Sequence, residues 1–167
     1  SKVLEKIKPY GVETSTIPVD DKGIVLTNKL MNLIRPNTGL ISIMLANNEI
    51  GSIQPIKEII KKICNHNIPL HTDAVQALGK IKINVNELGI DYLSLSAHKF
   101  YGPKGVGALF VNKKNNIKPF IIGGDQENGL RGGTENIAGI VGMGLAAELA
   151  IKDQNTCVKK LKKLEKH

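Results

Sequence analysis

Three clusters of polar residues each follow an apolar run of the chain, and their side chains suit chemistry on an aldehyde and an amine. The members are Asn48 after the first run, Asp73 and Gln76 after the second, and Ser96, His98 and Lys99 after the third. A lysine amine that has lost its proton forms a carbon–nitrogen double bond with an aldehyde. The third cluster therefore predicts a covalent anchor at Lys99.

Pyridoxal phosphate is the cofactor whose polar groups these residues match. Its pyridine nitrogen needs a carboxylate to stay protonated, because the protonated ring acts as an electron sink, and Asp73 is the candidate. The other donors are Asn48 and Gln76 for the phenolic oxygen, and Ser96, His98 and Thr134 for the phosphate. Each residue alone is common on surfaces, at helix caps or in turns. Only their joint occurrence at successive strand ends favours the cofactor.

The apolar runs predict an α/β fold with a mostly parallel sheet and flanking helices. The expected strands are 13–19, 38–45, 68–72, 90–96 and 106–111, and the expected helices are 1–8, 27–34, 55–64, 138–152 and another from 154. Thr27 is the expected cap of its helix, and Gly142 and Gly144 are expected packing points. Because ligands bind beyond the carboxyl ends of parallel strands, the three clusters are expected at one rim.

A glycine-rich loop, GGDQENGLRGGTEN at 123–136, is too long for a simple connector and predicts a functional loop. Its glycine N–H groups and the hydroxyl of Thr134 suit a phosphate. The loop matches neither GxGxxG nor the Walker A pattern, which argues against a nucleotide site.

Composition indicates one globular unit with an aliphatic core, since 41% of the 167 residues are hydrophobic and only 4% aromatic. The net charge of +8 raises the alternative of a nucleic-acid binder, but the lysines gather in a loop and a C-terminal run without interleaved aromatic residues. We therefore expect no nucleic-acid partner. No apolar run is long enough to predict a membrane partner. Cys64 and Cys157 form no metal motif and favour a cytoplasmic setting.

Four stretches resemble the NifS/IscS-like cysteine desulfurases, which are class V members of the pyridoxal-phosphate aminotransferase superfamily. They are IMLANNEIGSIQPI (43–56), HTDAVQALGK (71–80), LSAHKFYGPKGVGALFV (95–111) and GGDQENGLRGGTEN (123–136), in the order of that family. Asp125 departs from the glycine that is usual there. The joint match is specific, although no single stretch is.

The resemblance implies a full-length enzyme that converts L-cysteine to L-alanine and an enzyme-bound persulfide, for iron–sulfur cluster assembly or other sulfur transfer. Lys99 would anchor pyridoxal phosphate and later move the Cα proton of the substrate. Asn48 would bond either the phenolic oxygen or the substrate carboxylate, and Thr134 would reach the phosphate of the partner subunit in a homodimer. The resemblance gives Asp73, Gln76, Ser96 and His98 the roles stated above. A sulfur-acceptor or scaffold protein is a further implied partner.

The family chain is about 400 residues long, more than the usual single domain, so the resemblance covers only the centre of its large domain. It implies the large-domain fold of pyridoxal-phosphate transferases (aspartate aminotransferase-like) in incomplete form. Residues 1–150 would be the central part of that domain, and 151–167 a basic helix leading toward a small domain. The ring-stacking histidine would lie upstream of Ser1, so His71 is a different residue. The catalytic cysteine and the arginine for the substrate carboxylate would lie downstream. The sheet would lack strands, and we expect the 167 residues alone to be inactive and marginally stable, or paired with another copy.

Two alternatives stay open at this point. One is selenocysteine lyase or another class V enzyme, because the shared motifs do not distinguish the substrates. The other is a catalytically silent module for cofactor binding or assembly.

Overall fold

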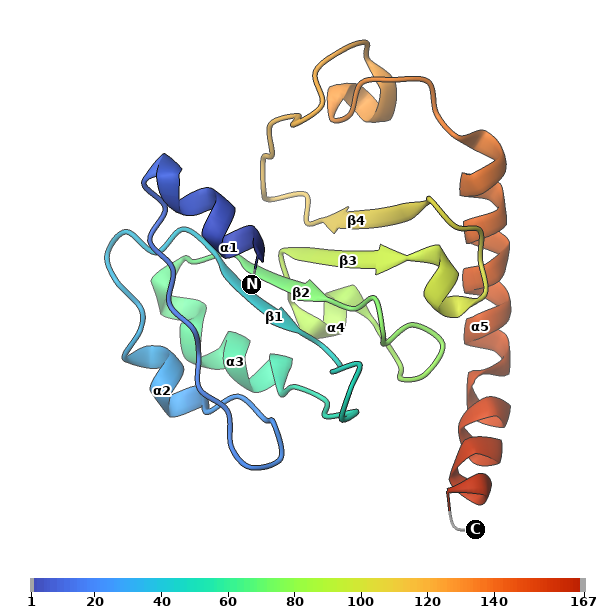
Figure 1. The fold of residues 1–167 in the computed structure, drawn as a ribbon, viewed down its shortest axis with the longest axis horizontal. Helices are drawn as coiled ribbons and strands as arrows, with labels where there is room; N and C mark the ends of the chain where they lie inside the picture. Colours follow the sequence, from blue (N-terminus) through green and yellow to red (C-terminus); the bar gives the residue numbers. More distant parts are fainter. Residues whose placement is uncertain (1, 166–167) are drawn as a thin grey trace.

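The computed structural model describes residues 2–165, and its centre is a four-stranded sheet (Figure 1). The strands are β1 (Ile41–Met44), β2 (Leu70–Asp73), β3 (Tyr92–Ser96) and β4 (Gly107–Val111), and they lie in the order β1-β2-β3-β4. The β1–β2 and β2–β3 pairs are parallel, and the β3–β4 pair is antiparallel. The expected mostly parallel α/β sheet is confirmed.

The helices connect and flank these strands. They are α1 (Lys2–Ile7), α2 (Thr27–Met31), α3 (Ile56–Ile63), α4 (Val85–Leu88) and α5 (Ile137–Leu164), with single turns of 3-10 helix at η1 (Lys8–Tyr10), η2 (Cys64–His66), η3 (Ala97–Phe100) and η4 (Gln126–Gly129). The long helix α5 runs past the end of the sheet at which β1, β2 and β3 finish (Figure 1).

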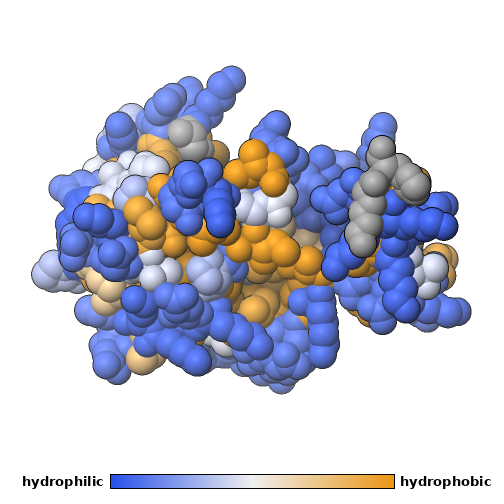
Figure 2. Space-filling model, turned by 90° about the horizontal axis from the view of Figure 1, so that it is seen from below, coloured by the Kyte–Doolittle hydropathy of each residue, from blue (hydrophilic) through white to orange (hydrophobic). Residues whose placement is uncertain are grey.

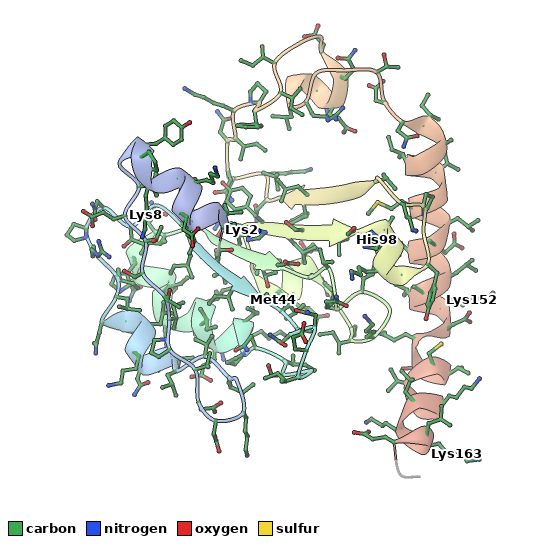
Figure 3. The ribbon with its side chains drawn as sticks, viewed as in Figure 1. Lys2, Lys8, Met44, His98, Lys152 and Lys163 are labelled. Carbon is green, nitrogen blue, oxygen red and sulfur yellow. The ribbon has the colours of Figure 1, made fainter. Side chains whose placement is uncertain are left out.

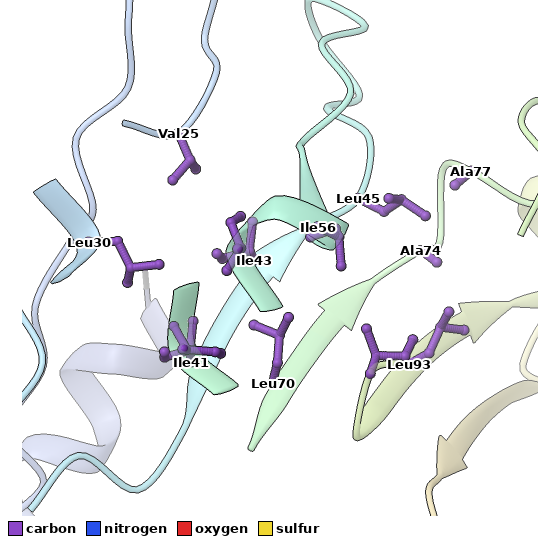
Figure 4. Close-up of a cluster of buried hydrophobic side chains, with 13 residues drawn as sticks. Val25, Leu30, Ile41, Ile43, Leu45, Ile56, Leu70, Ala74, Ala77 and Leu93 are labelled. Carbon is purple, nitrogen blue, oxygen red and sulfur yellow. The ribbon is translucent and has the colours of Figure 1, made fainter. Parts of the chain in front are cut away.

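The two faces of the sheet differ in polarity because side chains alternate along a strand. Ile41, Ile43 and Leu70 point into the core, where they meet Ile56 and Ile59 of α3 (Figure 4). Within α3, Ile56, Ile59 and Ile63 recur at helical spacing, so the helix buries one stripe of side chains and exposes its lysines. The alternate positions of β1, β2 and β3 carry mainly polar side chains on the opposite face, among them Ser42, His71 and Ser94. The core therefore lies on one side of the sheet only.

The expected strand at 13–19 is wrong. This segment is irregular, and its one ladder contact is an isolated bridge between Val19 and Val25. The alternation there is weak, Pro18 lacks an N–H donor, and no strand among residues 2–165 lies beside it to form a ladder. On the sheet itself, β1 has β2 as its one neighbour among the described strands.

The helix expected over 27–34 is shorter and differently capped. It ends at Met31, and its N-cap is Leu26 rather than Thr27. The Thr27 hydroxyl instead donates to Glu58 Oε1 at 2.8 Å, which ties α2 to α3. Leu26, with φ of −76° and ψ of 92°, takes the extended conformation of a cap, so Thr27 already lies within the first turn of the helix.

Residues 137–164 form one helix, where two had been expected with a break after 152. The polar segment between the expected helices contains neither proline nor glycine, so nothing ends the helix there. The division at residues 150 and 151 falls inside α5 and stays a prediction.

A Cβ on Gly142 would lie 2.7 Å from Pro103, so Gly142 is a packing point, whereas Gly144 faces open space and is not.

Large apolar side chains remain exposed on the described chain. Four of those on α5 are Ile137, Val141, Leu145 and Leu149, which are 69%, 66%, 57% and 48% exposed and recur every fourth residue. Figure 2 shows a band of hydrophobic residues across the middle of another face, between hydrophilic regions on either side. Apolar surface of this extent is typical of faces that other protein covers.

Asp91, directly before β3, is the centre of a buried hydrogen-bond network at the amino end of the parallel strands. It is 5% exposed, and its carboxylate accepts hydrogen bonds from the Leu70 N–H, the Asn115 amide and the Lys114 ammonium, all within 2.9 Å. Burial acts to raise the pKa of Asp91, but the bonds from Asn115 and Leu70 and the charge of Lys114 outweigh it and lower that pKa. The carboxylate thus joins the start of β2 to the segment that follows β4.

We expect Asp91→Asn to lower the free energy of unfolding by about 1–3 kcal/mol, because its amide N–H₂ would face donors. A pKa that is lower in the folded state contributes stability above the unfolded value of about 4, and this contribution is lost as the pH falls through the folded value. Urea unfolding of both proteins should therefore show the difference at pH 7 and a smaller one near pH 3. Asp21→Asn, at an exposed turn position, is the control; an equal effect of both changes would contradict the prediction.

Candidate functional site

The carboxyl ends of β1, β2 and β3 lie at the same end of the sheet, as their parallel pairing requires (Figure 1). Asp73 is the last residue of β2, and Ser96 is the last residue of β3. In Figure 3, Met44 at the end of β1 and His98 just beyond β3 lie along this end of the sheet. The structure thus brings the three polar clusters to one rim, although it records no hydrogen bond or ion pair between Lys99 and Asp73 among residues 2–165.

A single helical turn positions the cluster after β3. The Ser96 hydroxyl and His98 Nδ1 are 3.0 Å apart and form a hydrogen bond. Phe100 is buried at 2% exposure, while His98 and Lys99 in the same turn are exposed. Tyr101 then takes a left-handed conformation with φ of 67°, which ends the turn. The buried Phe100 holds the turn in place and leaves the Lys99 amine on the outside.

The turn after β2 orients Asp73 and Gln76. Asp73 Oδ1 accepts the Val75 N–H at 2.9 Å, so one carboxylate oxygen is fixed by the backbone. The Lys80 ammonium donates to the Gln76 carbonyl at 3.1 Å and to Gln76 Oε1 at 3.2 Å. With Oε1 engaged in this way, the Gln76 amide has its N–H₂ group left as a donor.

Asn48 and Gln76 line the same hollow, of about 480 Å³, between the turn after β1 and the turn after β2. The Asn47 side chain orders the first turn, because its Oδ1 accepts the N–H groups of Glu49 and Ile50 at 2.8 and 3.0 Å. The Asn48 amide donates to Glu49 Oε1 at 2.7 Å. Two amides from different strand ends therefore face one concave surface.

Thr134 does not join this group. It is exposed on the long segment between β4 and α5, which arches past the β4 edge of the sheet, away from the turn after β1 (Figure 1). The two cysteines are also elsewhere: Cys64 lies in η2, which leads into the opposite, amino end of β2, and Cys157 is exposed on α5.

Sequence reasoning missed two side chains of this region. Lys80 contacts Gln76 from one helical turn further along the chain, a spacing that could have been noticed. His71 lies on the same face of β2 as Asp73 and bonds to Ser42 and Ser94. The signal that could have found it is the polar residue that each predicted strand carries between apolar ones, namely Ser42, His71 and Ser94.

The set of side chains at the rim fits pyridoxal phosphate by chemistry. An amine is available for the aldehyde, a carboxylate for the ring nitrogen, amide N–H₂ groups for the phenolic oxygen, and a hydroxyl with an imidazole for the phosphate. Among residues 2–165, no group of three His, Cys, Asp or Glu side chains is arranged to hold a metal ion. No helix in the described part of the chain is long and apolar enough to cross a membrane.

Comparison with known proteins gives consistent matches along the whole chain. The cysteine desulfurase IscS of Dictyoglomus turgidum is 54% identical over 161 residues, covering 96% of this chain and 40% of its own length. The mitochondrial cysteine desulfurase of Arabidopsis thaliana is 48% identical over 161 residues, covering 95% of this chain and 36% of its own. The chain therefore spans about two fifths of the length of these relatives.

Solved structures show the same fold. A NifS-like protein superposes with a TM-score of 0.95 at 41% identity, over 99% of this chain and 46% of its own. SspA in complex with cysteine superposes with a TM-score of 0.82 at 45% identity, over 88% and 43% of the two chains. The family model for aminotransferase class-V matches residues 3–167. This chain belongs to the aminotransferase class-V family.

Proposed function

We propose that these residues form the central part of the cofactor-binding large domain of a pyridoxal-phosphate-dependent cysteine desulfurase. The observation that carries the proposal is the placement of Lys99, Asp73 and the two amides at or just beyond the carboxyl ends of three neighbouring parallel strands. The relatives named cysteine desulfurase and the neighbour solved with cysteine support L-cysteine as the substrate.

In this proposal, each polar group of the cofactor has a partner on the chain. The partners are Lys99 for the aldehyde carbon, Asp73 for the pyridine nitrogen, Gln76 and Asn48 for the phenolic oxygen, and Ser96 and His98 for the phosphate. The bound cofactor supplies an electron sink for the bonds at the substrate's Cα. The backbone bond from Val75 to Asp73 Oδ1 supports this assignment, because it leaves the other carboxylate oxygen for the ring nitrogen.

The chain's own contribution to the reaction is orientation and proton transfer. Lys99 Nζ takes the proton from the substrate's Cα and returns it to the carbon skeleton, a role that suits an exposed amine on a fixed turn. Asn48 has the substrate carboxylate as a further partner, from its position at the hollow. The sulfur passes to the catalytic thiol that the resemblance places in the small domain of the longer relatives, which neither Cys64, before the amino end of β2, nor Cys157, on α5, matches.

A homodimer is part of the proposal. Thr134, on the arching segment away from the rim, would then serve the phosphate of the partner subunit. The exposed apolar stripe on α5 supports the presence of further protein around these residues, from the same longer chain or from a second copy. Residues 151–167 would lead toward the small domain. A cytoplasmic location and a sulfur-acceptor or scaffold partner are proposed on the resemblance alone.

The test is the turnover of amino acids by the full-length protein. Incubated with pyridoxal phosphate, it is expected to release alanine and transferable sulfur from L-cysteine. The comparison substrate is L-selenocysteine. A preference for selenocysteine would favour the lyase, and turnover of neither would leave a silent cofactor-binding module.

A further inference from the structure

His71 joins three parallel strands on the polar face of the sheet. Its Nδ1 lies 2.7 Å from the Ser42 hydroxyl of β1, and its Nε2 lies 2.8 Å from the Ser94 hydroxyl of β3. The imidazole thus spans β1, β2 and β3 with one hydrogen bond on each side.

The bond from His71 to Ser94 runs diagonally toward the carboxyl ends of the strands. In the register of the sheet, His71 is opposite Tyr92, whereas Ser94 is opposite Asp73. The β2–β3 ladder is only three residue pairs long, so a side-chain bond is a substantial part of what fixes it. The imidazole therefore fixes the end of β2, which carries Asp73, against the end of β3, which leads to Lys99.

His71 is expected to be neutral, which suits its position beside Asp73, the proposed partner of the protonated ring nitrogen. Burial lowers the pKa of His71, and the nearby Asp73 carboxylate opposes this only in part. A neutral imidazole donates from one ring nitrogen and accepts at the other, so both serines are satisfied. Because it carries no charge, it does not compete with a protonated ring nitrogen for Asp73.

We propose that His71 is a positioning residue, which uses Ser42 and Ser94 to hold the Asp73 and Lys99 ends of β2 and β3 at the separation that the cofactor requires. The inference rests on the proposed function and assigns His71 a role in cofactor binding without contact to the cofactor. It also gives a reason for the polar side chains of Ser42, His71 and Ser94 at the centre of strands whose other face packs against the core.

Thr72 provides a matched control. It is the next residue on β2, and its hydroxyl donates to the Ile43 carbonyl of β1 at 2.9 Å, on the buried face of the sheet. Thr72→Val therefore also removes a side-chain bond between β1 and β2, but on the face away from Asp73. A general loosening of the sheet would affect both variants, whereas positioning of Asp73 depends on His71.

The experiment measures pyridoxal phosphate affinity of the full-length protein by the absorbance band of the bound cofactor, alongside urea unfolding. His71→Leu is expected to raise the dissociation constant about tenfold, the lower end of what loss of an orienting outer-shell bond costs at metal sites. Ser94→Ala should act in the same direction, and Thr72→Val should stay within about twofold of wild type even though it unfolds more easily. His71→Gln, which is neutral and able to bond one serine, should lie between wild type and His71→Leu and guards against misfolding of the latter.

Equal affinities for wild type, His71→Gln and His71→Leu would overturn the proposal. An equal loss in Thr72→Val and His71→Leu would also overturn it, since the effect would then come from the stability of the sheet. If wild-type protein gives no band with pyridoxal phosphate, it is the proposed function that fails.

Discussion

Lys99→Ala is expected to abolish the absorbance band that the full-length protein develops with pyridoxal phosphate, and to reduce alanine formation from L-cysteine by about a thousandfold or more. Two functions disappear with the amine. One is the covalent bond to the cofactor aldehyde, and the other is the transfer of the Cα proton, which alone contributes on the order of 10²–10⁴ in rate. No other lysine replaces it on this turn, because the neighbouring side chains in the turn are histidine and phenylalanine.

The control for this change is Lys104→Ala. Lys104 is exposed in the segment between η3 and β4, five positions after Lys99, so it tests whether any lysine near the rim produces the band. We expect Lys104→Ala to keep the band and the activity within about twofold, as is usual for a surface substitution. A band of wild-type strength in Lys99→Ala would remove the main support for the proposed function.

The sheet and its functional edge could be predicted because they follow from local patterns. The runs at 38–45, 68–72 and 90–96, of which the first is near-continuously apolar and the last alternates, predicted β1, β2 and β3, and parallel pairing then required their ends, with Asp73 and Lys99, to lie on the same side. The amphipathic spacing of the isoleucines in α3 was equally readable. Each of these depends on residues that are close together in the sequence.

The features that could not be predicted depend on contacts between distant residues. Residues 13–19 have a weak strand pattern, but a strand requires a neighbour, and the sequence does not reveal whether one lies beside it. Thr27 has a side chain typical of a helix cap, but the helix already begins at Thr27, and its hydroxyl donates to Glu58 of α3, 31 residues away in the sequence. The same holds for His71, whose partners come from two other strands.

Asp73→Asn is expected to separate binding of the cofactor from its activation. Asparagine has nearly the same shape, and its Oδ1 can still accept the Val75 N–H, so the turn after β2 should keep its conformation. Lys99 is unchanged, and the absorbance band should therefore still form. The neutral amide, however, cannot hold the ring nitrogen in its protonated state as a carboxylate does, because a charge-assisted bond is about twice as strong as a neutral one. The ring then withdraws electrons less effectively, and the rate falls.

We expect kcat for L-cysteine to fall about a hundredfold in Asp73→Asn, with a smaller loss of cofactor affinity. A hundredfold change corresponds to about 2.7 kcal/mol, which is within the range for removing one charged partner at a reacting centre. Asp125→Asn, on the exposed glycine-rich loop, is the control and should retain wild-type kcat. Single-turnover measurements at saturating cofactor distinguish slower chemistry from incomplete loading. A wild-type kcat in Asp73→Asn would mean that another group protonates the ring, and the assignment of Asp73 would then be wrong. A lost band with normal folding would instead mean that Asp73 is needed for binding itself, because its charge would then be required before Lys99 can react.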